Sequence, residues 1–260
     1  MTSDKRNVRY RILRGCALQS RKVQYVLRRV ENAVERWTGS LLNGALRNAE
    51  KEALSIDLYD ASFRAQNDHD GLYAWETHWF ARRLPSPPGS ILIGAAGSGR
   101  EAVALRDLGY HVHAFEPSTS AFQCCQRALG SDLVDQASYQ DLVASVLHGT
   151  NTPLQLKPEA RFDAVLLGWG SFGHVLRSAD RLELLRACDH VAPNGPILLS
   201  IFEPKVKAAR NGTYYMPWGG FLVRPTTEEL GEHAKSLNRE LVVSLQSPSS
   251  YATLVPKILR

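Results

Sequence analysis

Residues 91–118 contain glycines and an acid whose types and spacing suit the binding of a nucleotide. Gly94, Gly97 and Gly99 follow an apolar run and precede a helical pattern, and Glu116 ends a second apolar run. Glycines in such a loop let a ligand approach the backbone, and the N-terminus of the following helix favours negative charge. A carboxylate at Glu116 can accept hydrogen bonds from both ribose hydroxyls of an adenosine. We therefore expect an adenosine-bearing ligand at this loop.

Two common nucleotide-binding loops do not match this stretch. A dinucleotide site needs Gly-x-Gly-x-x-Gly, whereas the three glycines here have the reverse spacing. No Gly-Lys-Ser/Thr follows them, which excludes a Walker-type phosphate loop. A nucleotide-dependent oxidoreductase is therefore disfavoured.

Apolar runs and helical patterns alternate from Ser90 onward. We expect strands at 90–93, 111–115, 133–137, 162–167 and 196–202, with helices at 99–109, 118–129 and 180–191. This alternation implies an α/β fold with a doubly wound, mostly parallel sheet. A further helix begins at Thr227, where Thr226 and Glu229 form a capping box. The runs "ELVVSLQ" and "YATLVP" after it predict a terminal antiparallel hairpin.

The chain is expected to comprise an N-terminal helical cap or arm at 1–84 and a Rossmann-like domain at 85–260. Val23, Leu27, Val30 and Val34 recur at helical spacing in the cap, and a break is expected at Gly39. The segment "LPSPPGS" marks the boundary between the two parts. The long aromatic segment at about 203–224 is expected to be a substrate insertion.

Composition favours a cytoplasmic protein. No apolar run approaches the length of a membrane span, and no signal peptide is recognised. Cys16, Cys124, Cys125 and Cys188 have no metal-ligand spacing, so we expect no metal and reduced thiols. Residues 1–36 hold ten Lys and Arg against three acids, while the rest of the chain is nearly neutral. A basic arm on a neutral body is weaker support for a nucleic-acid enzyme than a basic body.

The glycine stretch resembles the first motif of the class I S-adenosylmethionine-dependent methyltransferases, which reads hydrophobic, hydrophobic, acid, x, Gly-x-Gly-x-Gly. Gly97 and Gly99 match its last two glycines, Ala95 takes the place of the first, and Ile93 takes the place of the acid. "RFDAVLLGWGSFGHV" and "RLELLRACDHVAPNGPILLSIF" resemble the family's fourth strand, crossover helix and turn into strand five. The resemblance covers roughly residues 55–260. It implies a seven-stranded sheet with a reversed last strand and S-adenosylmethionine as cofactor.

The resemblance also implies roles for individual residues. "LYDASF" resembles the tyrosine-bearing helix entry over the methionine end, and "ASYQDL" resembles the segment that flanks the adenine. A backbone carbonyl at the end of the fourth strand can receive the cofactor's ammonium. The cofactor-binding residues expected are Tyr59, Gly94, Ala95, Gly97, Gly99, Glu116, Pro117, Ser138, Tyr139, Gly168 and Trp169.

The methyl acceptor is expected beside the turn after the fourth strand. His174 lies on that turn and can serve as the catalytic base, since its pKa is near the working pH. Tyr214, Tyr215 and Trp218 of the insertion, with His78 of the cap, are the expected substrate-binding residues.

The function expected is methyl transfer to an O or N atom of a small molecule. "GWGS" stands where enzymes that methylate base amino groups carry an Asn-Pro-Pro-Tyr-type motif. Two alternatives remain open: an RNA methyltransferase that docks through the basic arm, and a module that binds the cofactor without transferring a methyl group. The identity of the acceptor and the oligomeric state stay open.

Overall fold

The computed structural model describes residues 3–63, 71–157, 159–202, 208, 212–246 and 249–257. Chain contacts divide the molecule into two units, Met1–Leu46 and Arg47–Arg260. The first unit contains helix α1 (Ser3–Ala45), which continues through Gly39, so the break expected there is wrong. A single glycine costs a helix interior about 1 kcal/mol relative to alanine, which is too little to end a long helix.

The second unit includes two helices that the sequence assigned to the cap. Helix α2 (Asn48–Ser62) packs on the insertion, and α3 (Ala74–Arg83) packs on the terminal hairpin. Trp79 of α3 packs against Tyr251 in a tilted arrangement, with ring centroids 4.6 Å apart, and donates a hydrogen bond to Thr253 over 2.9 Å. Because both helices contact elements of the second unit, this unit begins at Arg47, and the proline-rich segment at 84–90 connects elements within it.

A seven-stranded sheet forms the centre of this unit, in the order β3-β2-β1-β4-β5-β9-β8. The first five strands in the chain pair in parallel, and β9 runs antiparallel to both β5 and β8. This arrangement confirms the doubly wound sheet with a terminal hairpin. The strands are β1 (Ser90–Gly94), β2 (His111–Phe115), β3 (Val134–Asp135), β4 (Ala164–Leu167), β5 (Ile197–Ile201), β8 (Arg239–Gln246) and β9 (Ser249–Pro256).

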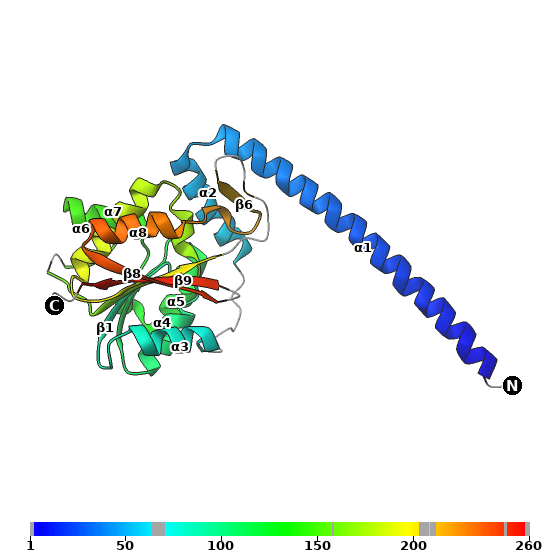
Figure 1. Ribbon diagram of the computed structural model, residues 1–260, viewed down its shortest axis with the longest axis horizontal. Coiled ribbons are helices and arrows are strands. Elements are labelled where there is room, and N and C mark those ends of the chain that lie inside the picture. Colours follow the sequence, from blue (N-terminus) through cyan, green and yellow to red (C-terminus); the bar gives the residue numbers. More distant parts are fainter. Residues whose placement is uncertain are drawn as a thin grey trace. The chain divides into compact units, whose positions relative to one another are not determined.

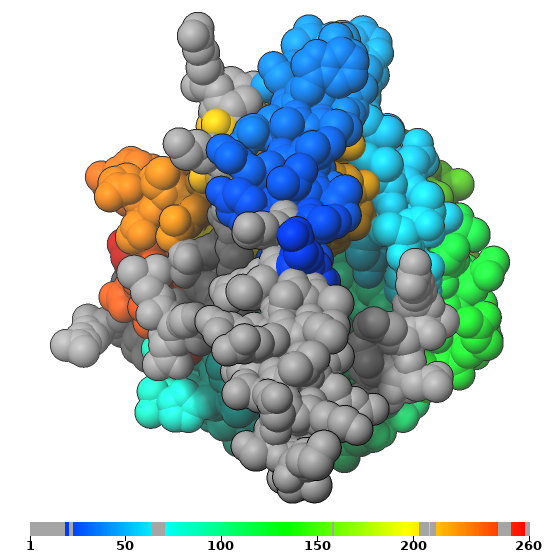
Figure 2. Space-filling model, turned by 90° about the vertical axis from the view of Figure 1, so that its right-hand side faces the viewer, coloured from blue at the N-terminus to red at the C-terminus, as the bar shows by residue number. Residues whose placement is uncertain are grey.

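Helices cover both faces of the sheet (Figure 1). On one face lie α3, α4 (Arg100–Asp107) and α5 (Thr119–Leu129); on the other lie α6 (Tyr139–His148), α7 (Ser178–Val191) and α8 (Thr227–Ser236). In the space-filling view, the orange atoms of α8 lie on the left and the green atoms of the middle part of the chain lie on the right (Figure 2). Strand residues such as Leu92 and Ile93 are buried on alternate faces, which is why the central strands read as continuous apolar runs.

The predicted insertion at 203–224 lies partly outside the described residues. Its described part forms a separate two-stranded sheet, β6 (Thr213–Met216) and β7 (Gly220–Val223). Two short 3₁₀ turns, η1 (Ser131–Leu133) and η2 (Ser171–His174), precede β3 and follow β4. Among the described residues, no helix combines the length and apolar character that crossing a bilayer requires.

Candidate functional site

A cavity of about 580 Å³ opens at the carboxyl edge of the sheet, within the second unit. In open α/β sheets ligands bind at this edge, near the point where strand order reverses. Here the reversal lies between β1 and β4. Of the residues expected from sequence, those lining the cavity are Tyr59, Ala95, Gly97, Glu116, Pro117, Ser138, Tyr139, Gly168, Trp169, His174 and Trp218.

The loop after β1 and the end of β2 are joined by Glu116. Its carboxylate accepts hydrogen bonds from the backbone N–H groups of Gly97 at 2.8 Å and Ser118 at 2.9 Å. Glu116 is only 3 % exposed, yet it lines the cavity. A carboxylate with four lone-pair sites and two bonds from the protein retains capacity for ligand hydroxyls.

Two of the expected glycines shape the loop without lining the cavity. A Cβ added to Gly94 would lie 2.7 Å from the Tyr139 ring and 2.8 Å from Phe115. Gly99 has φ +89°, and a Cβ there would lie 2.9 Å from the sulfur of Cys125 on α5. These contacts give both glycines a packing role: Gly94 lets β1 lie close to α6, and Gly99 lets the start of α4 lie close to α5.

Ala95 occupies the position of the motif's first glycine in a backbone conformation that favours glycine, with φ +51°. A left-handed conformation costs a residue with a side chain about 1–2 kcal/mol. We expect Ala95→Gly to raise the free energy of unfolding in urea by about 0.5–1 kcal/mol, because relief of strain exceeds the added chain entropy. Neighbouring Ala96, buried and without a positive φ, is the control, and Ala96→Gly should lower stability by about 1 kcal/mol. Equal destabilisation by both changes would contradict the assignment of strain to Ala95.

Burial raises the pKa of two carboxyl groups in the cavity wall. The pKa of Glu116 rises to about 7, opposed by its two backbone hydrogen bonds. The pKa of Glu101, on the first turn of α4, also rises to about 7, opposed by the charge of Arg100. The pKa of Tyr59 is raised too, through burial and the charges of Glu116 and Glu101, so its phenol stays protonated.

These shifts make the stability of the ligand-free protein depend on pH. Both carboxyl groups hold a proton more tightly in the folded than in the unfolded chain, so their contribution is full below pH 4.5 and disappears as pH rises through 7. We expect Glu116→Gln to reduce the loss of stability between pH 5 and pH 8 by on the order of 1 kcal/mol in urea titrations. Exposed Glu232→Gln serves as the control and should leave the difference unchanged. An unchanged pH dependence in Glu116→Gln would contradict the raised pKa.

The end of β4 is held by a chain of hydrogen bonds. The Gly168 carbonyl accepts from the Ser171 backbone N–H at 3.0 Å and from the Ser171 hydroxyl at 2.6 Å. The Tyr139 hydroxyl lies 2.6 Å from that of Ser171. Since Ser171 donates its proton to Gly168, Tyr139 donates to Ser171. Next to Gly168, Trp169 has φ +40° and an exposed side chain, so the strained turn holds an indole at the cavity.

Ser138 and Tyr139 also serve the structure. Ser138 is the N-cap of α6, where it forms a capping box with Asp141. The Tyr139 ring packs edge-on against Phe115, with centroids 5.8 Å apart. Both residues line the cavity while fixing the start of α6, so a ligand contact there would add to a structural role.

His174 lies on η2 and lines the cavity. Its Nδ1 lies 2.8 Å from the carbonyl oxygen of Phe221 on β7. A carbonyl only accepts, so Nδ1 carries the proton and Nε2 carries the lone pair. Burial lowers the pKa of His174, and the bond to Phe221 opposes this shift. The ring is therefore neutral at pH 7, the state that a general base requires.

Helix α2 and the β6–β7 sheet cover the cavity together. Glu52, Ile56, Tyr59 and Phe63 follow one another at helical spacing and all line it. Ser55, on the same helix, accepts a hydrogen bond from the Phe221 N–H at 2.8 Å. A Cβ on Gly220 would lie 2.3 Å from the Ser55 hydroxyl oxygen, so glycine permits this close docking.

Three expected substrate residues are not among those that line the cavity. His78 is exposed on α3, where Tyr73, just before the helix, lines the cavity instead. In β6, Tyr215 packs on Phe221 with ring centroids 5.2 Å apart, and the following residue, Met216, lines the cavity. Successive residues of a strand point to opposite faces, so Tyr215 and Met216 cannot share one. Tyr214 is half-buried and outside the lining as well.

Sequence reasoning missed several residues of the lining. Glu101 and Arg100 lie at the start of α4, where charged residues are usually solvent-exposed. The helical spacing of Glu52 and Ile56 with Tyr59 was a usable signal. Phe202 directly precedes the aromatic-rich segment, which marked the region without selecting this residue. The lining residues that were not expected include Glu52, Ser55, Ile56, Tyr73, Arg100, Glu101, Phe202 and Leu222.

Comparison with known proteins supports the fold. No family model and no curated protein sequence matches this chain. Among solved structures, it is similar to the CcbJ methyltransferase from Streptomyces caelestis, with a TM-score of 0.54 and 16% identity over 78% of this chain and 96% of that one. It is also similar to a methyltransferase from Bacteroides fragilis in complex with S-adenosyl-L-homocysteine, with a TM-score of 0.53 and 18% identity over 76% and 81% of the two chains.

A third similar structure is the sugar N-methyltransferase KedS8 from Streptoalloteichus, with a TM-score of 0.51 and 16% identity over 74% of this chain and 89% of that one. All three are methyltransferases, and this chain spans most of each. The chain therefore has the fold of the S-adenosylmethionine-dependent methyltransferases of class I.

Proposed function

We propose that this chain is an S-adenosylmethionine-dependent methyltransferase whose acceptor is a small molecule with an apolar or ring-shaped face, methylated at O or N. One observation carries the proposal. A single cavity joins a nucleoside-binding edge, with Gly97 and Glu116, to an aromatic wall beside a neutral histidine, with Trp169, Trp218 and His174. The sugar acceptor in the name of the Streptoalloteichus relative agrees with a small acceptor.

The residues present suit the cofactor. Gly97 has no side chain, so an adenosine can approach the loop closely, and Glu116 offers carboxylate oxygens to a ribose. Tyr59 places its hydroxyl over the same glycine, 3.3 Å from the position of a Cβ there. Bound here, S-adenosylmethionine would supply a methyl group on a cationic sulfur. The cavity volume lies within the usual range for pockets that enclose a ligand of drug size.

The residues of the chain would orient the acceptor and take up its proton. Trp169 and Trp218, together with Met216, present flat or apolar surfaces that exclude water and restrict the acceptor ring. His174 carries a lone pair on Nε2 and can take a proton from a hydroxyl as the bond to the methyl group forms. The bond from Nδ1 to Phe221 fixes this tautomer.

The experiment is methyl transfer from labelled S-adenosylmethionine to two pools: a library of small phenols, sugars and amines, and total RNA. We expect label in a small molecule that gains the mass of one methyl group. Label in RNA alone would overturn the small-molecule acceptor while keeping the methyltransferase. No transfer to either pool, with tight cofactor binding, would favour a non-catalytic module.

A further inference from the structure

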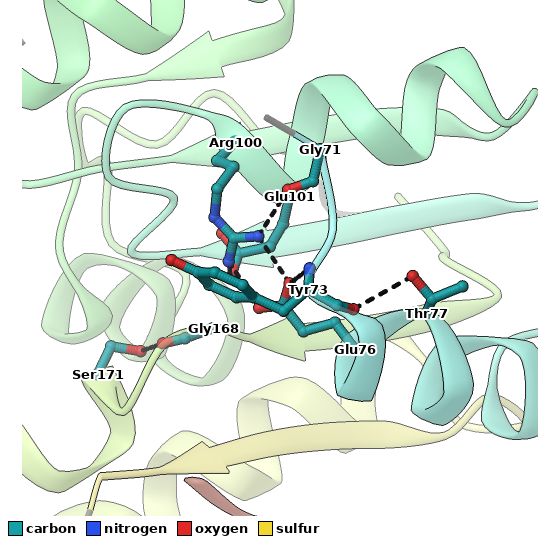
Figure 3. Close-up of polar contacts among 8 residues, drawn as sticks. All are labelled: Gly71, Tyr73, Glu76, Thr77, Arg100, Glu101, Gly168 and Ser171. Atoms are coloured by element: carbon teal, nitrogen blue, oxygen red, sulfur yellow. Dashed lines mark hydrogen bonds and ion pairs between the residues drawn. The ribbon is translucent and has the colours of Figure 1, made fainter. Parts of the chain in front are cut away.

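The described part of the cavity wall holds more acidic than basic side chains. Among the residues that the structure describes, Glu52, Glu101 and Glu116 line it, against the guanidinium of Arg100. That guanidinium is engaged outside the lining, since two of its nitrogens each lie 2.6 Å from a different carboxylate oxygen of Glu76. It also lies 4.4 Å from the centroid of the Tyr73 ring (Figure 3). Glu76 therefore compensates most of the Arg100 charge, and the described part of the wall favours a cationic ligand.

Within this wall, Glu101 lies against the end of β4. Its side chain is 7% exposed, and one carboxylate oxygen lies 3.2 Å from Arg100. A Cβ added to Gly168 would lie 3.1 Å from that oxygen and 3.8 Å from the other. The absence of a side chain at Gly168 thus lets the Glu101 carboxylate reach this edge of the sheet, where Figure 3 shows the two residues.

The Gly168 carbonyl is poorly suited to hold an ammonium group. Its oxygen has two lone pairs, and it accepts one hydrogen bond from the Ser171 N–H and a second from the Ser171 hydroxyl. The Ile93 side chain, 1% exposed in the core, offers no acceptor either. Glu101 is then the carboxylate beside the end of β4 that can accept from a cationic group.

We propose that Glu101 binds the α-ammonium group at the amino-acid end of S-adenosylmethionine. This inference rests on the proposed function. In the sheet, β1 lies between β2 and β4. A ligand whose ribose meets Glu116 after β2 and which crosses the loop after β1 brings its other end to Gly168 and Glu101. The carboxylate comes from the first turn of α4 here, whereas the family motif places an acid in β1, at the position of Ile93.

The surroundings of Glu101 agree with this role. Burial and the nearby charge of Glu76 raise its pKa, and Arg100 only partly offsets them. An ammonium group would add a second positive charge and hydrogen-bond donors beside it, which favours the ionised carboxylate. The start of α4 is fixed by the buried pair of Arg100 and Glu76, so the carboxylate is held in place before a ligand arrives.

The test compares two ligands on three proteins by titration calorimetry at pH 8. S-adenosylhomocysteine carries the nucleoside and the amino-acid end, whereas 5′-methylthioadenosine carries the nucleoside and sulfur only. We expect Glu101→Gln to raise the dissociation constant of S-adenosylhomocysteine by about 10- to 100-fold. The dissociation constant of 5′-methylthioadenosine should stay within about twofold of the wild-type value. Glu116→Gln is the matched control and should weaken both ligands by a similar factor.

Each other outcome overturns the assignment. Equal weakening of both ligands by Glu101→Gln would make Glu101 a structural residue, and unchanged S-adenosylhomocysteine affinity would remove it from the site. If the wild-type protein binds neither ligand, the proposed function fails first. If Glu101→Gln does not fold, the wild-type protein is titrated with S-adenosylhomocysteine lacking its amino group. A loss below about tenfold would then contradict the pairing with a carboxylate.

Discussion

Replacing His174 with alanine is expected to lower the turnover of a hydroxyl acceptor by about 10²–10⁴-fold. The affinity for S-adenosylhomocysteine should stay within about twofold, because no proton is transferred on binding. The expectation follows from the tautomer: Nδ1 donates to the Phe221 carbonyl at 2.8 Å, which leaves the lone pair on Nε2. Burial lowers the pKa of His174, so the basic form persists below the ordinary value of 6.5. Steady-state kinetics and calorimetry measure the two quantities separately.

The control for this variant is His78→Ala, because His78 is exposed on α3 and outside the cavity lining. It should retain wild-type turnover. In His174→Ala, a small effect with an amine acceptor that is already neutral agrees with the account. If the turnover of a hydroxyl acceptor falls only slightly in His174→Ala, His174 is not the catalytic base.

Replacing Glu116 with alanine is expected to weaken S-adenosylhomocysteine by roughly 1.5–3 kcal/mol, the scale of hydrogen bonds to a charged group. The side chain both lines the cavity and accepts from the Gly97 and Ser118 N–H groups, so its loss removes ligand contacts and loosens the loop. Thermal unfolding of the free protein measures the destabilisation that results from loosening the loop. Calorimetry measures the total loss of binding free energy, from the loop and from the missing ligand contacts together. Exposed Glu232→Ala should change neither. An unchanged affinity in Glu116→Ala would remove this carboxylate from the ribose.

The sheet and the cofactor edge could be predicted because their signals are local. The spacing between Gly97 and Glu116 corresponds to one loop, helix and strand, and the structure brings the Gly97 nitrogen 2.8 Å from the Glu116 carboxylate. Buried parallel strands appear in the sequence as apolar runs. The hairpin after α8 was indicated by the polar turn residues between its two strand-like segments. Parallel strands of one sheet bring their carboxyl ends to a common edge, so the positions of Gly168 and Trp169 followed.

The rest depends on contacts between distant segments. A glutamate in the first turn of a helix normally faces solvent. Glu101 is buried here beside Gly168, which leaves space for its carboxylate, and beside Arg100, which pairs with Glu76. Whether Met216 or Tyr215 lines the cavity depends on which face of β6 is turned toward the cavity. The sequence of a four-residue strand beside a turn does not indicate that face. The boundary after Leu46 depends on how α2 and α3 pack, which their own sequences do not state.

The central claim is that this cavity binds S-adenosylmethionine, and calorimetric titration of the wild-type protein with S-adenosylhomocysteine and with NAD tests it most directly. Gly94, Gly97 and Gly99 have the reverse of the spacing found in a dinucleotide site. The Glu116 carboxylate, beside this loop, can accept hydrogen bonds from one ribose. We predict one S-adenosylhomocysteine bound per chain with a dissociation constant on the order of micromolar, about −8 kcal/mol, and no heat of binding with NAD. Binding of NAD without binding of S-adenosylhomocysteine would contradict the account.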